Sequence, residues 1–265
     1  MPDDLAAALA RVRLGRLAST ILCYRTIGST NDAAATLAAR GADAEGTVVC
    51  ADEQTAGRGR RGHVWFSPPG SGLYVSVVLR PGGAQREPDR ATTLVTLMAG
   101  VALVEGIETA TGLRADLKWP NDLLIGRRKL AGILAEGVML AAPRLSTVVV
   151  GYGINIATSA YPPDVSERAT SLETELGRPI DRGLVLAETL AALSARYDDL
   201  IAGRFDAILD AWRSRAASAA GARVMWTSPS GPLSGVTAGI DDRGALLVRL
   251  GDRLERIVAG EVTWL

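Results

Sequence analysis

The alternation of apolar and polar positions predicts a mixed order of strands and helices over residues 1–220. Strand patterns cover 21–27, 47–52, 73–79 and 145–154, and the segment 118–132 is expected to form two strands that turn at Gly126 and Arg127. Helical patterns cover 3–17, 28–40, 89–111, 184–202 and 205–217, and Ser29 and Asp32 have the spacing of a capping box. This order predicts an α/β or α+β domain built on a central sheet.

The pattern changes after Gly221. Short alternating runs cover 222–227, 236–240, 245–250 and 255–258, and segments rich in Gly, Pro, Ser and Asp separate them. Several short strands in close succession are typical of a small barrel. We therefore expect two domains, at 1–220 and 221–265.

The composition argues against several classes of protein. The 29 basic and 29 acidic residues cancel, and a dedicated nucleic-acid binder would need an excess of positive charge to neutralise phosphates. The acidic start at Met1–Asp4 is unlike a secretory signal, and no stretch offers about 18 uninterrupted apolar residues. Cys23 and Cys50 lie in apolar strand patterns, so we expect buried thiols without a disulfide or a metal. A cytoplasmic protein is expected.

Lysine is rare in this chain. Two of the 29 basic residues are lysines, Lys118 and Lys129, and both lie in the segment 118–132. Because arginine supplies positive charge everywhere else, a retained lysine indicates a place that needs a compact charge with three rotatable donors, such as a phosphate site. Two surface lysines that are close by chance are the alternative.

The segment 54–66 concentrates residues that bind anions. Glycines allow successive amides to turn toward a ligand, and arginines add forked donors for phosphate or carboxylate. The residues concerned, with one histidine and one tryptophan, are Gly57, Arg58, Gly59, Arg60, Arg61, Gly62, His63 and Trp65. A flexible basic turn is the alternative. The segment lacks both the Walker A ending and the dinucleotide fingerprint, and the chain's one histidine and two cysteines supply neither a zinc ligand set nor a nucleophile–base pair.

Three further clusters have polar groups suited to a ligand. Ser29, Thr30 and Asn31 stand at a strand-to-helix junction, where they hydrogen-bond either a small ligand or the helix terminus. Asn121 and Asp122 follow a Trp-Pro pair, where they either hold a divalent cation or form a turn. The glycines of 151–155 either admit an adenine closely or form another turn.

Taken in order, five motifs resemble those of biotin–protein ligases. They are Gly28-Ser29-Thr30-Asn31, the stretch 53–62, Lys118-Trp119-Pro120-Asn121-Asp122, the stretch 128–134 and the stretch 151–155. The resemblance covers residue 21 to the C-terminus and implies an α+β fold like that of class II synthetases: a mixed-sheet catalytic domain with flanking helices, followed by a small SH3-like β-barrel. It implies synthesis of biotinyl-5′-adenylate from biotin and ATP. Biotin would then pass to a lysine of the carboxyl carrier domain of a biotin-dependent carboxylase, such as acetyl-CoA carboxylase.

The resemblance also implies roles for individual residues. Lys129 and Arg60 would be catalytic, with Lys129 between the biotin carboxylate and the α-phosphate. Biotin would contact Ser29, Thr30, Asn31, Gln54, Gly57, Arg58, Gly59, Arg60, Lys129 and Gly132. ATP or the adenylate would contact Arg61, Trp65, Lys118, Asn121, Asp122 and Asn155, and Asp122 would hold the Mg²⁺ that accompanies ATP. The loop 57–62 would close over the intermediate.

Alternatives and departures from the family pattern remain. Some family members have a further basic residue where His63 stands, which leaves the role of His63 open. Certain ligases begin with a winged-helix domain, and because 20 residues precede the first strand here, neither that domain nor direct binding of DNA is expected. A lipoate–protein ligase or octanoyltransferase would share the fold, but Gln54 and Arg58 favour biotin. A non-catalytic biotin or nucleotide sensor is the rival from another class.

Overall fold

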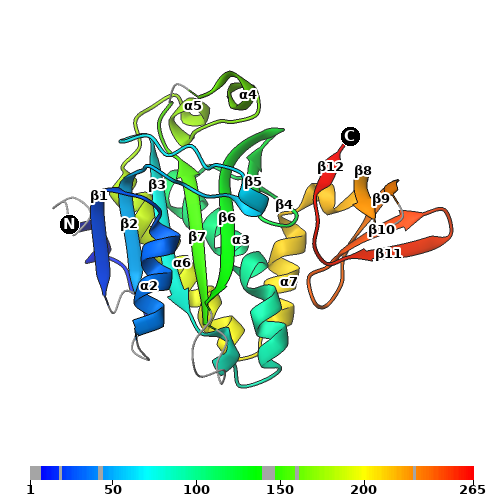
Figure 1. Ribbon diagram of the computed structural model, residues 1–265, viewed down its shortest axis with the longest axis horizontal. Helices are drawn as coiled ribbons and strands as arrows, with labels where there is room; N and C mark the ends of the chain where they lie inside the picture. The colour runs from blue at the N-terminus through cyan, green and yellow to red at the C-terminus, as the bar shows by residue number, and fades with distance from the viewer. Residues whose placement is uncertain (1–6, 18–19, 41–43, 139–146, 159–160, 229–230) are drawn as a thin grey trace.

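The computed structural model describes residues 7–17, 20–40, 44–138, 147–158, 161–228 and 231–265. Its larger sheet has seven strands in the order β1-β2-β3-β7-β6-β5-β4 (Figure 1). The bounds are β1 Ile21–Ile27, β2 Val48–Gln54, β3 Gly72–Leu79, β4 Asp116–Lys118, β5 Asp122–Ile125, β6 Arg128–Val138 and β7 Thr147–Asn155. β1 and β2 are parallel and the other neighbouring pairs are antiparallel, so the predicted mixed sheet is confirmed.

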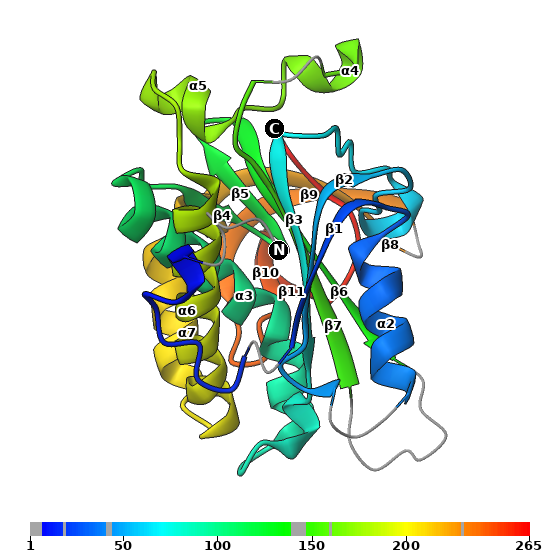
Figure 2. The same cartoon turned by 90° about the vertical axis from the view of Figure 1, so that its left-hand side faces the viewer.

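Helices cover both faces of this sheet. α2 (Thr30–Arg40) lies on one face, and α3 (Pro88–Thr111), α6 (Arg182–Ile201) and α7 (Phe205–Ser214) lie on the other (Figure 2). Asp181 caps α6 by accepting hydrogen bonds from the amides of Gly183 and Leu184. The short helices α4 (Pro163–Ser166) and α5 (Leu172–Leu176), which the sequence pattern did not predict, lie beyond the end of the sheet.

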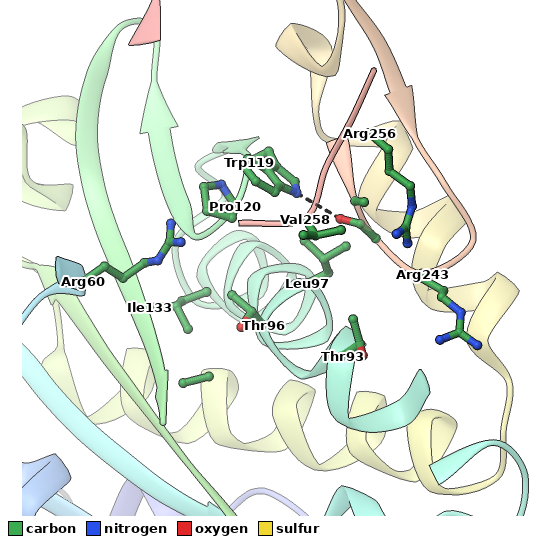
Figure 3. A pocket seen from close by; sticks show the side chains of 13 residues that line it. Arg60, Thr93, Thr96, Leu97, Trp119, Pro120, Ile133, Arg243, Arg256 and Val258 are labelled. Carbon is green, nitrogen blue, oxygen red and sulfur yellow. Dashed lines mark hydrogen bonds between the residues drawn. The ribbon is translucent and has the colours of Figure 1, made fainter. Parts of the chain in front are cut away.

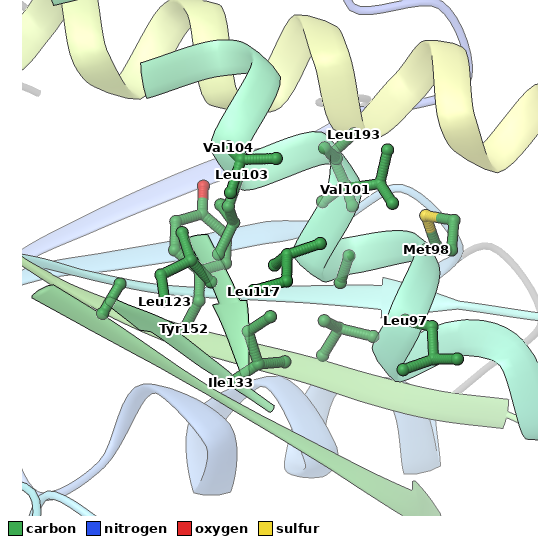
Figure 4. Packing of buried hydrophobic residues seen from close by; sticks show 14 of the residues in the cluster. Leu97, Met98, Val101, Leu103, Val104, Leu117, Leu123, Ile133, Tyr152 and Leu193 are labelled. Carbon is green, nitrogen blue, oxygen red and sulfur yellow. The ribbon is translucent and has the colours of Figure 1, made fainter. Parts of the chain in front are cut away.

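The core forms where α3 packs between the sheet and α6. Leu97 of α3 faces the sheet, on the side of Ile133 of β6, whereas Met98 and Val101 face α6, where Val101 lies near Leu193 (Figure 4). α3 is long and apolar enough to cross a membrane by length and composition, yet 72% of its most apolar window is buried inside the fold. This burial identifies the function of its apolar residues as core packing.

The second sheet is C-terminal and antiparallel. Its order is β11-β10-β9-β8-β12, with β8 Ala220–Ser228, β9 Gly231–Ile240, β10 Leu246–Leu250, β11 Arg253–Ile257 and β12 Val262–Trp264. The four predicted runs are strands, and β12 was not predicted. Within the described residues β11 pairs with β10 and β12 pairs with β8, but β11 and β12 do not pair with each other. The sheet is therefore open, and the expected closed barrel is not found.

Two expectations from the sequence are wrong. The N-terminal helix does not continue to Leu17, because helical structure ends at residue 9 within the described part; residues 1–6 lie outside it. Cys23 and Cys50 are not separate thiols but form a disulfide. The parallel register of β1 and β2 sets them directly opposite each other, with their Cα atoms 4.7 Å apart.

Candidate active site

A cavity of about 490 Å³ lies at the end of the large sheet that faces the loop 55–66. Its wall is formed by the start of α2, this loop, β4 to β7 and the chain before β12. Fifteen of the predicted site residues line it: Ser29, Thr30, Asn31, Gln54, Arg58, Gly59, Arg60, Arg61, Trp65, Lys118, Asn121, Asp122, Lys129, Gly132 and Asn155. Gly57, which belongs to this loop, does not, because it packs against the returning chain; a Cβ there would come within 2.4 Å of the Trp65 carbonyl oxygen.

A buried polar cluster forms one side of the cavity. Gln54 Oε1 accepts hydrogen bonds from the amide of Thr30 (2.9 Å) and from its hydroxyl (3.0 Å). The hydroxyl of Ser76 on β3 lies 2.8 Å from Thr30 Oγ1 and 2.6 Å from Asn31 Oδ1. Thr30 and Asn31 begin α2 while Gln54 ends β2, so the parallel β1–β2 pair brings these separate motifs together.

The loop folds back on itself as a closed turn. Gly59 N donates to His63 O at 2.7 Å and Trp65 N donates to Gly57 O at 2.9 Å. At its tip Arg61 and Gly62 both have positive φ, 55° and 80°, a conformation that glycine adopts without strain. Arg60 Nη1 donates to Asn121 Oδ1 at 3.2 Å, which connects the loop to the chain between β4 and β5.

Trp65 lies against bare backbone. A Cβ on Gly153 would come within 2.3 Å of the indole Nε1, and one on Gly132 would come within 2.9 Å of a ring carbon. Glycine at these two positions of β6 and β7 therefore makes room for the indole ring. Lys129 Nζ lies 5.2 Å from the centre of the same ring, within the range of a cation–π contact.

Positive charge gathers at the other side of the cavity. Lys129 Nζ forms an ion pair with Asp122 Oδ1 at 2.6 Å, and Lys118 Nζ lies 4.7 Å from the centre of the Trp264 ring. Burial lowers the pKa of Lys118; the charge of Asp122 opposes this shift, and that of Lys129 adds to it. Burial also lowers the pKa of Arg60, with the charge of Arg61 adding to the effect. These shifts show cations that are crowded and partly desolvated, a suitable environment for a polyanion.

Two parts of the wall were not predicted as site residues. The segment that contributes Tyr161, Val165, Arg168 and Ala169 is joined to the start of β6, since Lys129 N donates to Arg168 O at 2.7 Å. Asn155 Nδ2 also holds this segment, by donating to Thr170 O at 2.9 Å. Gly260, Glu261 and Val262 enter from the C-terminal sheet. Apart from Arg168 and Glu261 these residues lack charged groups, so their residue types alone do not indicate a place in a binding site.

A second cavity of about 250 Å³ lies between α3 and the C-terminal sheet (Figure 3). Trp119 Nε1 donates to Gly244 O at 3.0 Å and so joins the two sheets at its edge. Arg60 lines both this cavity and the larger one.

Comparison with known proteins places this arrangement in a family. The model of the biotin/lipoate A/B protein ligase family matches residues 23–155, and the model of the biotin protein ligase C-terminal domain matches residues 221–263. The chain belongs to the biotin/lipoate A/B protein ligase family. Its members include the bifunctional ligase/repressor BirA of Bacillus subtilis, to which the chain is 37% identical over 91% of its own length and 73% of the relative's.

Two further members of this family are similar over most of the chain. The biotin--[acetyl-CoA-carboxylase] ligase of Mycobacterium tuberculosis is 35% identical over 90% of this chain and 86% of the relative. The solved biotin protein ligase of Aquifex aeolicus in complex with biotin and ATP is 27% identical, with a TM-score of 0.78 over 93% of this chain and 99% of that one. The family fold therefore extends over both sheets.

Proposed function

We propose that this family member is an ATP-dependent biotin–protein ligase. It makes biotinyl-5′-adenylate from biotin and ATP, releases diphosphate, and transfers biotin to a lysine of a biotin carboxyl carrier domain. The observation that carries the proposal is a single cavity that has a neutral hydrogen-bonding side at Thr30 and Gln54 and a cationic side at Lys129, whose ammonium lies over the indole of Trp65. The relatives named biotin ligases and the ligase solved with biotin and ATP support it.

The neutral side suits the ureido ring of biotin. A ureido group has one carbonyl acceptor and two N–H donors, and the groups at hand are the hydroxyls of Ser29 and Thr30 and the amide of Gln54. All three side chains are uncharged and can both donate to the ureido carbonyl and accept from its N–H groups. Trp65 would cover the apolar part of biotin, and Gly132 would hold the indole close to the β6 backbone.

Adenylate formation brings two anions together. An oxygen of the biotin carboxylate attacks the α-phosphorus of ATP, and the bond from that phosphorus to the diphosphate oxygen breaks. Lys129 would leave its ion pair with Asp122 and lie between carboxylate and α-phosphate, while Lys118, Arg60 and Arg61 would face the phosphates. Asn121 would hold Arg60 in place, through the 3.2 Å hydrogen bond between them, and Asn155 would support the adenine side.

In the second step the carrier lysine attacks the acyl carbon and AMP leaves with the bonding electrons, while the amine loses a proton. The mixed anhydride must not meet water before the lysine arrives. The loop from Gly57 to Gly62 would exclude water by closing over the intermediate, with Gly59 and Gly62 as its flexible points and Arg60 as its contact with the cavity wall.

Magnesium would accompany ATP and neutralise phosphate charge. Among the described residues no group of three or more His, Cys, Asp or Glu forms a metal cluster, so a protein cage for the ion is not indicated there. Asp122 alone suits the task, because Mg²⁺ bound to ATP usually needs one or two protein carboxylates and takes its other ligands from phosphate and water.

The partner would be the carrier domain of a biotin-dependent carboxylase such as acetyl-CoA carboxylase, in the cytoplasm. We place the boundary between the catalytic and C-terminal domains at 220/221, where β8 begins. Lys118 and Glu261 would be the points where the two domains share the ATP site, because Lys118 contacts Trp264 of β12.

A blot with labelled streptavidin tests the proposal. Purified protein, a carrier domain, biotin and Mg-ATP should give one biotinylated band, which should disappear when ATP is omitted or when the acceptor lysine of the carrier is replaced by arginine. Calorimetric titration separates the related lipoate ligase, because biotin should bind and lipoate should not. Absence of a band with an intact carrier, or preferential binding of lipoate, would overturn the proposal.

A further inference from the structure

Seven polar side chains are linked by close polar contacts that start in the cavity wall and run behind it. This chain of contacts begins at Gln54 Oε1, which accepts from the amide of Thr30, and passes through the Thr30 and Ser76 hydroxyls, 2.8 Å apart, to Asn31 Oδ1, 2.6 Å from Ser76 Oγ. The Ser76 hydroxyl has one proton, so it donates to one of these two neighbours at a time. The chain of contacts continues from Asn31 Nδ2 to Glu136 Oε2 at 2.7 Å, and from Glu136 to Arg58. Its last member, Asp32, accepts from Arg58 at 2.7 Å. The chain thus joins the neutral side of the cavity to an arginine near the start of the loop.

The contact between Arg58 and Glu136 has the geometry of a fork. Arg58 Nη1 donates to Glu136 Oε1 at 3.0 Å, and Nη2 donates to Oε2 at 2.8 Å. Two parallel bonds fix the orientation of the guanidinium plane, which a single contact does not. The Glu136 side chain is 34% exposed against 63% for Asp32, so Glu136 is the better shielded of the two carboxylates.

Asn31 is held inside the wall. Its Oδ1 lies 2.6 Å from the Ser76 hydroxyl, and its Nδ2 donates to Glu136 and, at 3.4 Å, to Leu134 O. A Cβ on Gly151 would come within 1.9 Å of the same Oδ1, so this glycine provides the space that the amide occupies. The protein therefore holds both the oxygen and the nitrogen of the Asn31 amide, which fixes the position of this side chain.

We propose that Glu136 is a positioning residue for the ligase reaction, which orients Arg58 and couples the biotin-binding side of the cavity to the closing loop. This inference rests on the proposed function. A ligand that moves Thr30 or Gln54 shifts Ser76 and Asn31, and Glu136 carries that shift to Arg58, because its Oε2 accepts from both Asn31 and Arg58. Binding of biotin and closure of the loop then favour each other.

Replacing Glu136 by glutamine tests this role with little change of volume. The amide can still accept from Asn31, but it then turns its NH₂ group toward the donors of Arg58. We expect biotin to bind roughly 5- to 10-fold more weakly by calorimetry, the size expected for charge-assisted bonds between partly exposed groups. The KM for ATP should change less than about twofold, and trypsin should cut the ligand-free loop faster. Glu53→Gln is the matched control, because Glu53 lies on β2 and its carboxylate accepts an exposed hydrogen bond from the Thr26 hydroxyl at 2.9 Å, outside this chain of contacts.

A double-mutant cycle separates positioning from a merely structural effect. If Glu136 acts through Arg58, Arg58→Gln and Arg58→Gln/Glu136→Gln should bind biotin within about twofold of each other. Ser76→Ala interrupts the chain at another point and should weaken biotin binding severalfold, which keeps the test available if the Glu136 variant fails to fold. Effects that multiply in the cycle, or unchanged biotin binding in folded Glu136→Gln and Ser76→Ala, would overturn the inference. Because binding is read by calorimetry, a wild-type protein that binds biotin but releases no diphosphate would count against the proposed function alone.

Discussion

Replacing Lys129 by alanine should abolish adenylate formation while the fold stays intact. The side chain is 35% exposed and its ion-pair partner Asp122 is 22% exposed, so this is a partly solvated pair. Such pairs contribute about 1 kcal/mol or less to stability. The chemical step should lose far more, because a cation that meets charge developing on the phosphate contributes about 3–4 kcal/mol, or roughly 10²- to 10³-fold in rate.

The assay is a single-turnover measurement of diphosphate release with biotin and Mg-ATP in the rapid-quench regime. Lys129→Met should lose as much as Lys129→Ala, since it keeps the stem near the Trp65 ring and removes only the charge. Lys118→Met is the control that removes the other lysine charge of the cavity. Lys118 Nζ lies over the Trp264 ring, away from the place proposed for the biotin carboxylate, so this variant should mainly raise the KM for ATP. A Lys129→Met variant with near-normal single-turnover release would refute the assignment.

Three further predictions concern the loop, the cavity wall and the C-terminal sheet. Arg60→Ala removes the hydrogen bond to the cavity wall, so the adenylate should leak and biotinylate bystander lysines, visible on a streptavidin blot; unchanged leakage would exclude a lid. Gly153→Ala pushes a Cβ into Trp65 and should destabilise the protein by about 1–3 kcal/mol in urea unfolding, whereas Gly137→Ala, with open space around its Cβ, should not. Burial raises the pKa of Asp241, but hydrogen bonds from an arginine and two backbone amides outweigh it and hold that pKa below 3.8. Asp241→Asn should therefore cost about 1 kcal/mol at pH 7, and the difference should vanish as the pH falls through the lowered pKa; a difference that persists at low pH would contradict this.

Periodicity predicted most elements of the large sheet because each strand carries its own signal. β1 has the bounds expected for it, and the turn at Gly126 joins β5 to β6 as predicted. The short helices α4 and α5 and the strand β12 were missed, because segments of three to five residues are too short to show a period. The disulfide was missed for another reason: whether Cys23 faces Cys50 depends on strand register, which neither cysteine's neighbours reveal.

The sequence by itself determined the candidates for the chemistry: the glycine- and arginine-rich loop, the two lysines and the polar start of α2 all stand out by residue type, and the structure brings them to one cavity. Tertiary structure decided what holds them. Ser76 stood in a predicted strand and Glu136 outside any predicted element, and neither was a candidate site residue, yet Glu136 meets Asn31 across 105 positions of the chain and forms a forked contact with Arg58. Likewise the indole of Trp65 rests on glycines of two other strands. The physical reason is that charge and hydrogen-bonding capacity belong to a residue, whereas its partner depends on which strands lie side by side.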